Sequence, residues 1–173
     1  QNLTRIEGAQ EFIDGHLVDV LELFKTEWLG QRVLDIGSGS GVPGLLAAAL
    51  DTQTSREWVL TESETHKAEY LSRTAALLGL KQVSVYGERV ENVIKSVSPD
   101  TVIARAVGTV DKMAAWIWNC STWNNLVLFK SRGWKDEWER ARITKFGKKL
   151  TVTHTHEYSV GDKYRVLVKL TRT

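Results

Sequence analysis

The sequence of 173 residues predicts an α/β protein in which helices cover both faces of a seven-stranded, mostly parallel sheet. Short apolar segments typical of strands alternate with amphipathic segments typical of helices along most of the chain. A short connection around "SVGD" (residues 159–162) separates the last two strand-like segments, and such a connection favours an antiparallel pair. We therefore expect the last strand to run antiparallel to the others.

The elements can be placed in order from apolar spacing and from turn residues. A first helix is expected over residues 11–25, because apolar side chains recur there at helical spacing: Ile13, Leu17, Val20 and Phe24. The expected strands cover residues 32–36, 56–62, 82–87, 100–106, 125–130, 150–156 and 164–170. Further helices are expected over "GLLAAAL" and residues 91–97, 111–119 and 134–146.

Boundary signals mark two of the expected helices. Pro43 suits the first turn of the helix "GLLAAAL", where its missing N–H does no harm. In "TESE", Thr61 resembles the cap of a capping box, with Glu64 three residues later. The helix that follows has one apolar face and is expected to end at Gly79. That face consists of Ala68, Leu71, Ala75 and Leu78.

Composition fits one domain in a reducing compartment, and we expect a cytoplasmic protein. The chain is 42% hydrophobic and 25% charged, and its single cysteine excludes an internal disulfide. No apolar run approaches the roughly 20 residues needed to cross a membrane. Residues 1–66 hold 4 Lys/Arg and 11 Asp/Glu, whereas residues 67–173 hold 19 and 10. The basic second part suggests a polyanionic partner, although a solvated lysine surface would have the same composition.

The glycine-rich turn after the first strand predicts a small-molecule site. "GSGVPG" (Gly39–Gly44) matches the dinucleotide pattern G-x-G-x-x-G, and "DIGSGSG" (Asp35–Gly41) matches the D-x-G-x-G-x-G signature of class I methyltransferases. In both folds a carboxylate at the end of the second strand binds ribose hydroxyls, and Glu62 occupies that position. The glycine pattern alone leaves both interpretations open.

Seven segments spread over nearly the whole chain distinguish between these interpretations: "NLTRI" (residues 2–6), the H-x-x-D of His16 and Asp19, "VLDIGSGSGVPGLLAA", "ESETHKAEYLSRTAALLGL", "GERVENV", "DTVIARAV" and "LVLFKSRG". In this order they resemble one family, the bacterial GidB/RsmG proteins, which methylate N-7 of a guanine in small-subunit (16S) ribosomal RNA. The resemblance implies a class I, Rossmann-like methyltransferase fold. It also implies a single domain over residues 1–173 that lacks the helical N-terminal extension of the family.

S-adenosylmethionine is the cofactor that this resemblance implies. The implied cofactor-binding residues are Asp35, Gly37, Ser38, Gly39, Gly41, Val42, Glu62, Val90, Glu91 and Arg105. The glycines would let the backbone face the methionine end, Glu62 would bind the ribose, and Val90 and Glu91 would border the adenine. Glu62 and Glu91 could instead serve as helix N-terminal acids, and Arg105 could instead form a structural salt bridge.

The implied partner is 16S ribosomal RNA or the small ribosomal subunit, bound by a monomer. The residues proposed to contact RNA are His16, Lys67, Lys130, Arg132 and Arg165, and Trp134 could stack on a flipped base. Because guanine N-7 carries no proton, no general base is required, and we assign no catalytic residue. His154 and His156 lack a third ligand at suitable spacing, so we expect no metal. Two alternatives stay open: a related enzyme acting on another RNA or a small molecule, and an inactive RNA-binding module.

Overall fold

A single seven-stranded sheet organises the computed structural model, which describes residues 8–53 and 55–173. The strand order is β3-β2-β1-β4-β5-β7-β6. The strands are β1 (Arg32–Ile36), β2 (Glu57–Thr61), β3 (Val83–Tyr86), β4 (Thr101–Arg105), β5 (Asn125–Lys130), β6 (Leu150–Val160) and β7 (Lys163–Arg172). β7 is antiparallel to β5 and to β6, whereas β1 to β5 pair in parallel. The predicted sheet, with its last strand reversed, is confirmed.

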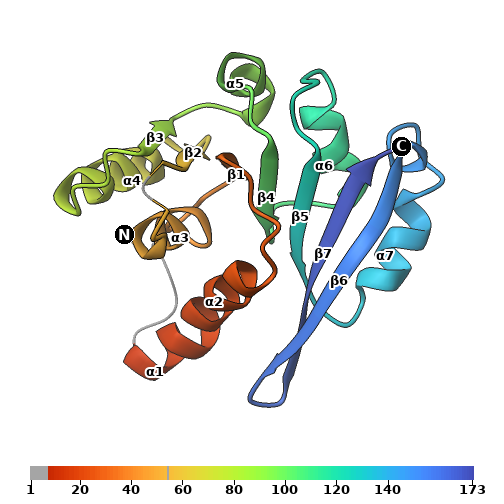
Figure 1. Ribbon diagram of the computed structural model, residues 1–173, viewed down its shortest axis with the longest axis horizontal. Helices are drawn as coiled ribbons and strands as arrows, with labels where there is room; N and C mark the ends of the chain where they lie inside the picture. Colours follow the sequence, from red (N-terminus) through yellow and green to blue (C-terminus); the bar gives the residue numbers. More distant parts are fainter. Residues whose placement is uncertain (1–7, 54) are drawn as a thin grey trace.

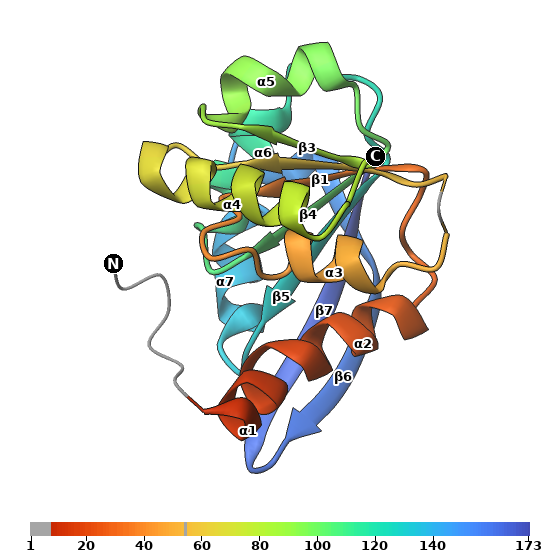
Figure 2. The same ribbon diagram turned by 90° about the vertical axis from the view of Figure 1, so that its left-hand side faces the viewer.

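Helices cover both faces of this sheet (Figures 1 and 2). They are α1 (Ala9–Phe12), α2 (Val18–Lys25), α3 (Gly44–Leu50), α4 (Thr65–Leu77), α5 (Val90–Val97), α6 (Val110–Ile117) and α7 (Trp134–Ala141), with a π-helical segment η1 (Ile13–Leu17) and a 3₁₀ turn η2 (Gly147–Lys149). On one face α2 and α3 pack over Val33 and Trp58, and α4 packs over Leu60. On the other face α5, α6 and α7 pack over Leu34. The central strands are therefore apolar on both sides, as a covered parallel sheet requires.

The β6–β7 hairpin is longer than expected from the sequence. Its turn consists of two residues, Gly161 and Asp162, so β6 extends through Val160 into the predicted "SVGD" connection and β7 begins at Lys163, one residue earlier than expected. β5 ends at Lys130, which pairs with Val166, and residues 163–165 therefore extend beyond the end of β5. This part of the hairpin lies alongside α2, to which it is joined by hydrogen bonds from Tyr158 and Arg165 to Asp19 (Figure 2).

The predicted N-terminal helix is interrupted near its beginning. Residues Ile13–Leu17 form a π-helical turn between α1 and α2. Of the predicted apolar face, Val20 is buried and Leu17 and Phe24 are half-buried, whereas Ile13, in the π-helical turn, is 39% exposed. His16, Asp19 and Leu23 are buried as well, which the apolar spacing did not predict. The expected similarity of residues 2–6 lies outside the described residues.

Three other boundaries differ from the predictions. The N-cap of α4 is Glu64 rather than Thr61, so the predicted capping box is wrong. Leu78 lies past the end of that helix and is 57% exposed, although Gly79 ends it as predicted, with a φ of +67°. Pro43 is the N-cap of α3, one residue before the first turn. α7 ends at Ala141, five residues earlier than expected.

No helix among the described residues is both long and apolar enough to span a membrane.

Candidate functional site

Two pockets flank the end of β4, at the edge of the sheet where the parallel strands have their carboxyl ends. Arg105 and Ala106 line a wide pocket of about 910 Å³. Val107, the next residue, lines a narrow pocket of about 100 Å³ together with Gly37 and Val90. Ligands of parallel α/β sheets bind outside the carboxyl ends of the strands, so the location of both pockets is typical of a functional site.

The glycine-rich turn forms the wall of the narrow pocket. Gly37, Gly39 and Gly41 all have positive φ angles, of 63°, 56° and 98°, which side chains with a Cβ rarely adopt. A Cβ on Gly37 would also lie 3.1 Å from Val107. The turn is joined to β2 by the hydrogen bond from Ser38 N to Thr61 O, 3.0 Å long. The predicted glycine positions are thus needed for the backbone itself.

Glu62 supports this turn through both of its carboxylate oxygens. Oε2 accepts a 2.9 Å hydrogen bond from Gly39 N, and Oε1 accepts one of 2.9 Å from Glu64 N. The side chain is buried, at 9% exposure, directly between Thr61 and Ser63, which line the narrow pocket. Glu62 therefore joins the glycine turn to the beginning of α4, which sequence spacing alone did not predict.

Asp35 is a buried carboxyl group beneath the same turn. Its Oδ2 accepts a 3.0 Å hydrogen bond from Gly44 N at the start of α3, whereas Oδ1 has no partner among the described residues. Burial raises the pKa of Asp35 to about 7, although the bonds from Ser38 and Gly44 oppose the rise. The carboxyl group of Asp35 therefore keeps its proton to a higher pH than an ordinary surface aspartate does.

Val90 and Glu91 reach the narrow pocket from the beginning of α5. Val90 is 4% exposed, whereas Glu91 lies on the surface. The structure therefore brings three of the residues expected to bind cofactor, Gly37, Val90 and Glu91, to one pocket. Ser38, Gly39 and Gly41 belong to the same turn, and Val42 follows it half-buried.

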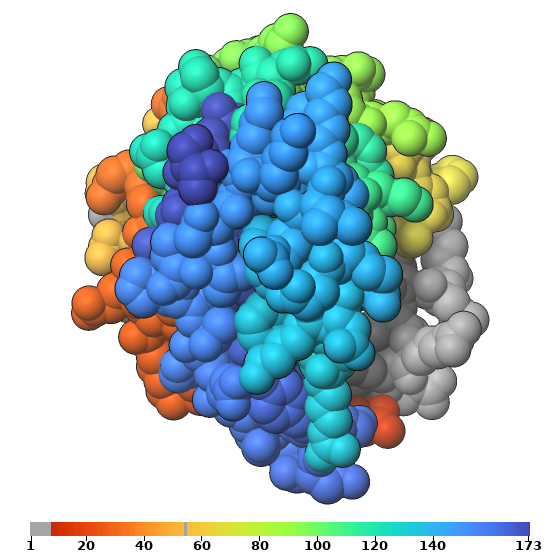
Figure 3. Space-filling model, turned by 90° about the vertical axis from the view of Figure 1, so that its right-hand side faces the viewer, coloured from red at the N-terminus to blue at the C-terminus, as the bar shows by residue number. Residues whose placement is uncertain are grey.

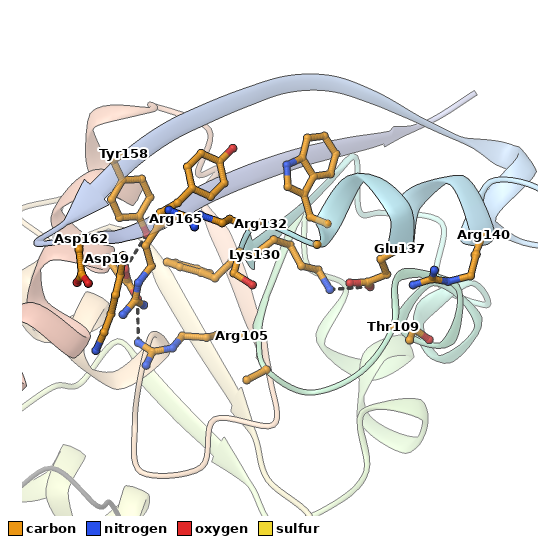
Figure 4. Close-up of a pocket in the computed structure, with 17 residues that line it drawn as sticks. Asp19, Arg105, Thr109, Lys130, Arg132, Glu137, Arg140, Tyr158, Asp162 and Arg165 are labelled. Carbon is orange, nitrogen blue, oxygen red and sulfur yellow. Dashed lines mark hydrogen bonds and ion pairs between the residues drawn. The ribbon is translucent and has the colours of Figure 1, made fainter.

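Asp19 is the centre of a charged cluster in the wide pocket (Figure 4). Its side chain accepts hydrogen bonds at Oδ2 from Arg105 (3.1 Å) and from Arg165 (2.7 Å), and at Oδ1 from Tyr158 (2.7 Å). Asp19 is 0% exposed, so its charge is compensated entirely inside the protein. Burial, followed by the bond to Asp19, raises the pKa of Tyr158 above its ordinary value.

His16 lies next to this cluster rather than on the pocket surface. Its Nδ1 is 3.0 Å from Arg105 Nη2 and 2.8 Å from Gly15 O. Burial, and then the Arg105 guanidinium, lower the pKa of His16 below its ordinary value. A neutral His16 next to Arg105 fits the structural role better than contact with RNA.

Lys130 is the second charged position of the wide pocket. Its Nζ donates a 2.8 Å hydrogen bond to Glu137 Oε1 on α7, and the same oxygen accepts from Val110 N at 3.0 Å. Arg132 lines the same pocket and is exposed. Lys67, by contrast, is not among the residues that line it and pairs with Glu64 on α4. The structure therefore brings three of the five expected RNA contacts, Lys130, Arg132 and Arg165, to the wide pocket, whereas His16 lies behind its surface and Lys67 lies apart from it.

The wide pocket combines positive charge with aromatic walls. Six of the residues that line it are basic and three are acidic: Arg105, Lys130, Arg132, Arg140, Lys163 and Arg165 against Asp19, Glu137 and Asp162. The aromatic lining consists of Phe129, Trp134, Tyr158 and Tyr164. The adjoining surface formed by the C-terminal part of the chain is shown in Figure 3. Positive charge with aromatic rings is the pattern expected where single-stranded nucleic acid binds.

The two histidines considered for metal binding have other contacts. His154 packs against the Trp28 ring, and His156 pairs with Glu22 through Nε2 at 2.7 Å. Within the described part of the chain, no group of three His, Cys, Asp or Glu side chains could hold a metal ion.

Sequence reasoning missed Tyr158, Tyr164 and Glu137 as parts of the site. Tyr158 comes from β6, where it pairs in register with Arg165 of β7. A two-residue turn at Gly161 and Asp162 would have predicted this pairing, because the register of a hairpin follows from its turn. Glu137 carried no such signal, since it resembles the other charged residues of an amphipathic helix.

Comparison with known proteins shows what the chain is similar to. The profile of the family described as rRNA small subunit methyltransferase G matches residues 1–166. The chain is 37% identical to ribosomal RNA small subunit methyltransferase G of Nitrosococcus oceani over 80% of this chain and 64% of the relative. It is 35% identical to the protein of the same name from Rhodopirellula baltica, over 82% of this chain and 60% of the relative.

Structural comparison identifies the same fold class. A mutant of MtNAS, solved in complex with S-adenosylmethionine, superposes with a TM-score of 0.64 at 20% identity, over 88% of this chain and 61% of that one. This likeness shows the fold, whereas the sequence relatives show the family. Because the family profile covers nearly all of its sequence, this chain belongs to the rRNA small subunit methyltransferase G family.

Proposed function

We propose that this chain binds S-adenosylmethionine and methylates N-7 of a guanine in small-subunit (16S) ribosomal RNA. The observation that carries the proposal is the pair of pockets on either side of residues 105–107. The narrow pocket is built by a glycine-rich turn, and the wide pocket next to it is basic and aromatic. Family membership supports the same function, although the chain spans about 60% of the length of these two relatives.

The residues at the narrow pocket fit the cofactor. Gly37 lines the narrow pocket with a positive φ and without a Cβ, so its main chain is available to a ligand there. We assign the ribose hydroxyls to Glu62, which would accept hydrogen bonds from them while it supports Gly39. Val90 and Glu91 would border the adenine. The remaining predicted contacts lie in the turn itself or beneath it: Asp35, Ser38, Gly41 and Val42.

When bound, S-adenosylmethionine supplies a methyl group on a positively charged sulfur. Guanine N-7 carries a lone pair and no proton, so the chain has no proton to remove from it. The task of the protein is to hold the base in line with the methyl group and to exclude water. Such positioning can lower a barrier by roughly 7–11 kcal/mol. Trp134 is suited to stack on the target base, because it lines the wide pocket and is half-buried.

Positive charge in the wide pocket would bind the phosphates of the RNA. Lys130, Arg132 and Arg165 are the predicted contacts that lie there, and phosphate contacts position an RNA without reading its sequence. Arg105 lines this wide pocket and not the narrow one, so we assign it to the boundary between cofactor and RNA. We further propose that the protein acts as a monomer in the cytoplasm.

Two experiments test the proposal separately. In the first, S-adenosylmethionine is titrated into the protein by calorimetry, where a saturable heat is expected; its absence contradicts the cofactor assignment. In the second, small-subunit ribosomal RNA from cells lacking the protein is digested and its nucleosides are analysed. One 7-methylguanosine should be missing relative to the parent strain. An unchanged modification profile together with cofactor binding would favour an enzyme of the same fold with another substrate.

A further inference from the structure

Asp19 binds two arginines and a tyrosine at once, which is more than a single salt bridge would provide. One carboxylate oxygen accepts hydrogen bonds from two arginines, Arg105 at 3.1 Å and Arg165 at 2.7 Å. The other oxygen accepts from Tyr158 at 2.7 Å. The three donors come from β4, β6 and β7, and the acceptor from α2, so the contact joins four elements at one point. Figure 4 shows the two guanidinium groups on the same side of the pocket.

The register of the hairpin explains why two of these donors meet Asp19 together. Tyr158 and Arg165 are paired residues of β6 and β7, so their side chains extend from the same face of the hairpin. Both belong to the part of the hairpin that extends beyond the end of β5. α2 packs against this part of the hairpin. The 2.7 Å contact of His156 Nε2 on β6 with Glu22 Oε2 on α2 is a second contact between the hairpin and α2.

The charge balance of the cluster leaves a site for an anion. Two guanidinium groups face one carboxylate, which leaves a net charge of +1 at the cluster. The Asp19 side chain is 1% exposed, whereas Arg105 and Arg165 are 21% and 22% exposed. An anion in the pocket can therefore reach the arginines but not the aspartate. Each guanidinium has five N–H donors, so donors are left over after the bonds to Asp19.

We propose that Asp19 is a positioning residue that holds Arg105 and Arg165 as a two-arginine clamp for one backbone phosphate of the RNA. The clamp lines the wide pocket beside Lys130, Arg132 and Lys163, which suits a polyanion rather than the single carboxylate of a cofactor. Paired arginine donors match a phosphate in geometry as well as in charge. Arg105 also lies two residues before Val107 of the narrow pocket, so the clamp sets the distance between RNA and cofactor.

This inference rests on the proposed function for its choice of RNA as ligand. Its first test, however, is a binding measurement that needs no methyl transfer. Binding of a short fluorescein-labelled single-stranded RNA is measured by anisotropy for wild type, Asp19→Asn, Arg165→Ala and the double variant. Arg165→Ala should weaken RNA binding in the wild-type background because it removes an arginine that Asp19 holds in place. In the Asp19→Asn background the same change should weaken RNA binding less, by a factor of at least about three. Equal losses in both backgrounds would overturn the clamp.

The second test measures methyl transfer to small ribosomal subunits that lack the modification. It distinguishes positioning of the arginines by Asp19 from simple electrostatic attraction of the RNA. Asp19→Asn removes a negative charge from a basic pocket, so RNA affinity should not fall through charge alone. Its kcat should nevertheless fall on the order of 10- to 100-fold, because the arginines lose their fixed geometry. Calorimetric affinity for S-adenosylmethionine should stay unchanged. A weakened cofactor affinity with unchanged RNA binding would assign the clamp to the cofactor instead and overturn the proposal.

A matched control variant distinguishes the proposed clamp from a role of Asp19 that only docks α2 against the β6–β7 hairpin. Glu22→Gln alters the contact of Glu22 with His156 Nε2 (2.7 Å), which also joins α2 to β6, without touching either arginine. Its kcat should stay within about twofold of wild type, since such partly exposed pairs contribute little. Equal losses in Glu22→Gln and Asp19→Asn would show that Asp19 serves helix docking only.

A second variant covers the case in which Asp19→Asn fails to fold. Arg165→Lys keeps the charge on the surface hairpin but removes the forked donor, so kcat should fall while RNA affinity changes little. Wild-type activity in Arg165→Lys would overturn the proposal. If the wild-type protein itself transfers no methyl group to RNA, the proposed function fails, and the anisotropy cycle still decides the clamp.

Discussion

Glu62 Oε2 accepts a hydrogen bond of 2.9 Å from the backbone N–H of Gly39, which ties the end of β2 to the glycine-rich turn after β1. The same side chain uses its other oxygen for Glu64 N at the beginning of α4. One buried carboxylate therefore orders two segments that border the narrow pocket.

Glu62→Gln should weaken binding of S-adenosylmethionine by about tenfold or more. Glutamine has one side-chain oxygen, so it cannot accept from Gly39 and Glu64 at the same time, and it would offer the ribose a different pattern of donors. The measurement is calorimetric titration of both proteins. Glu64→Gln is the control, because Glu64 is exposed and pairs only with Lys67 among its charged neighbours. A change of less than about twofold in Glu62→Gln would contradict the assignment.

Gly44→Ala should lower the free energy of unfolding by about 1–3 kcal/mol. A Cβ at this position would lie 2.5 Å from both Asp35 Oδ2 and Leu60 Cδ2, and neither atom belongs to a surface side chain. Urea unfolding followed by circular dichroism measures the loss. Gly133→Ala is the control, since nothing lies within 4 Å of a Cβ there. Equal stability of Gly44→Ala and wild type would show that the turn is loosely packed.

Asp35 should make stability depend on pH in a direction opposite to that of most aspartates. Its pKa in the folded protein, about 7, lies above its ordinary value of 3.8. Between these values the folded state binds a proton that the unfolded state has lost, so stability falls as pH rises from about 4 to about 7. The loss from this one group is at most about 1.4 kcal/mol per pH unit.

Urea unfolding at pH 5 and pH 7, for wild type and Asp35→Asn, measures this effect. The asparagine does not ionise, so its protein should lose less stability between the two pH values than wild type does. All other titrating groups are common to both proteins and cancel in the comparison. Parallel pH dependence in the two proteins would show that Asp35 does not take up its proton in this range.

Lys130→Gln should reduce the salt dependence of RNA binding by about one unit in the slope of log Kd against log salt concentration. Lys130 lines the wide pocket and pairs there with Glu137. Lys95→Gln is matched in charge but lies in the last turn of α5 and lines neither pocket. Binding by anisotropy at several salt concentrations gives both slopes. Equal changes in the two variants would show that the RNA responds to net charge alone.

The alternation of strands and helices and the glycine-rich turn could both be predicted from the residues alone. Apolar periodicity placed the strands, because a parallel sheet covered on both faces requires continuous apolar segments. The glycines of the turn were identifiable because their backbone angles exclude other residues. Glu62 was placed correctly at the end of β2, since chain order alone brings the ends of neighbouring parallel strands to one edge of the sheet.

Only the tertiary structure decided how the charged residues combine. Asp19 lies 86 residues before Arg105 and 146 before Arg165, and no local pattern links positions so far apart. The π-helical turn Ile13–Leu17, which precedes Asp19, was also not predictable, because helical spacing assumed a regular helix there. Long-range side-chain contacts depend on how helices and hairpins pack against each other. Sequence periodicity describes each element alone, so it cannot report which charges of separate elements meet.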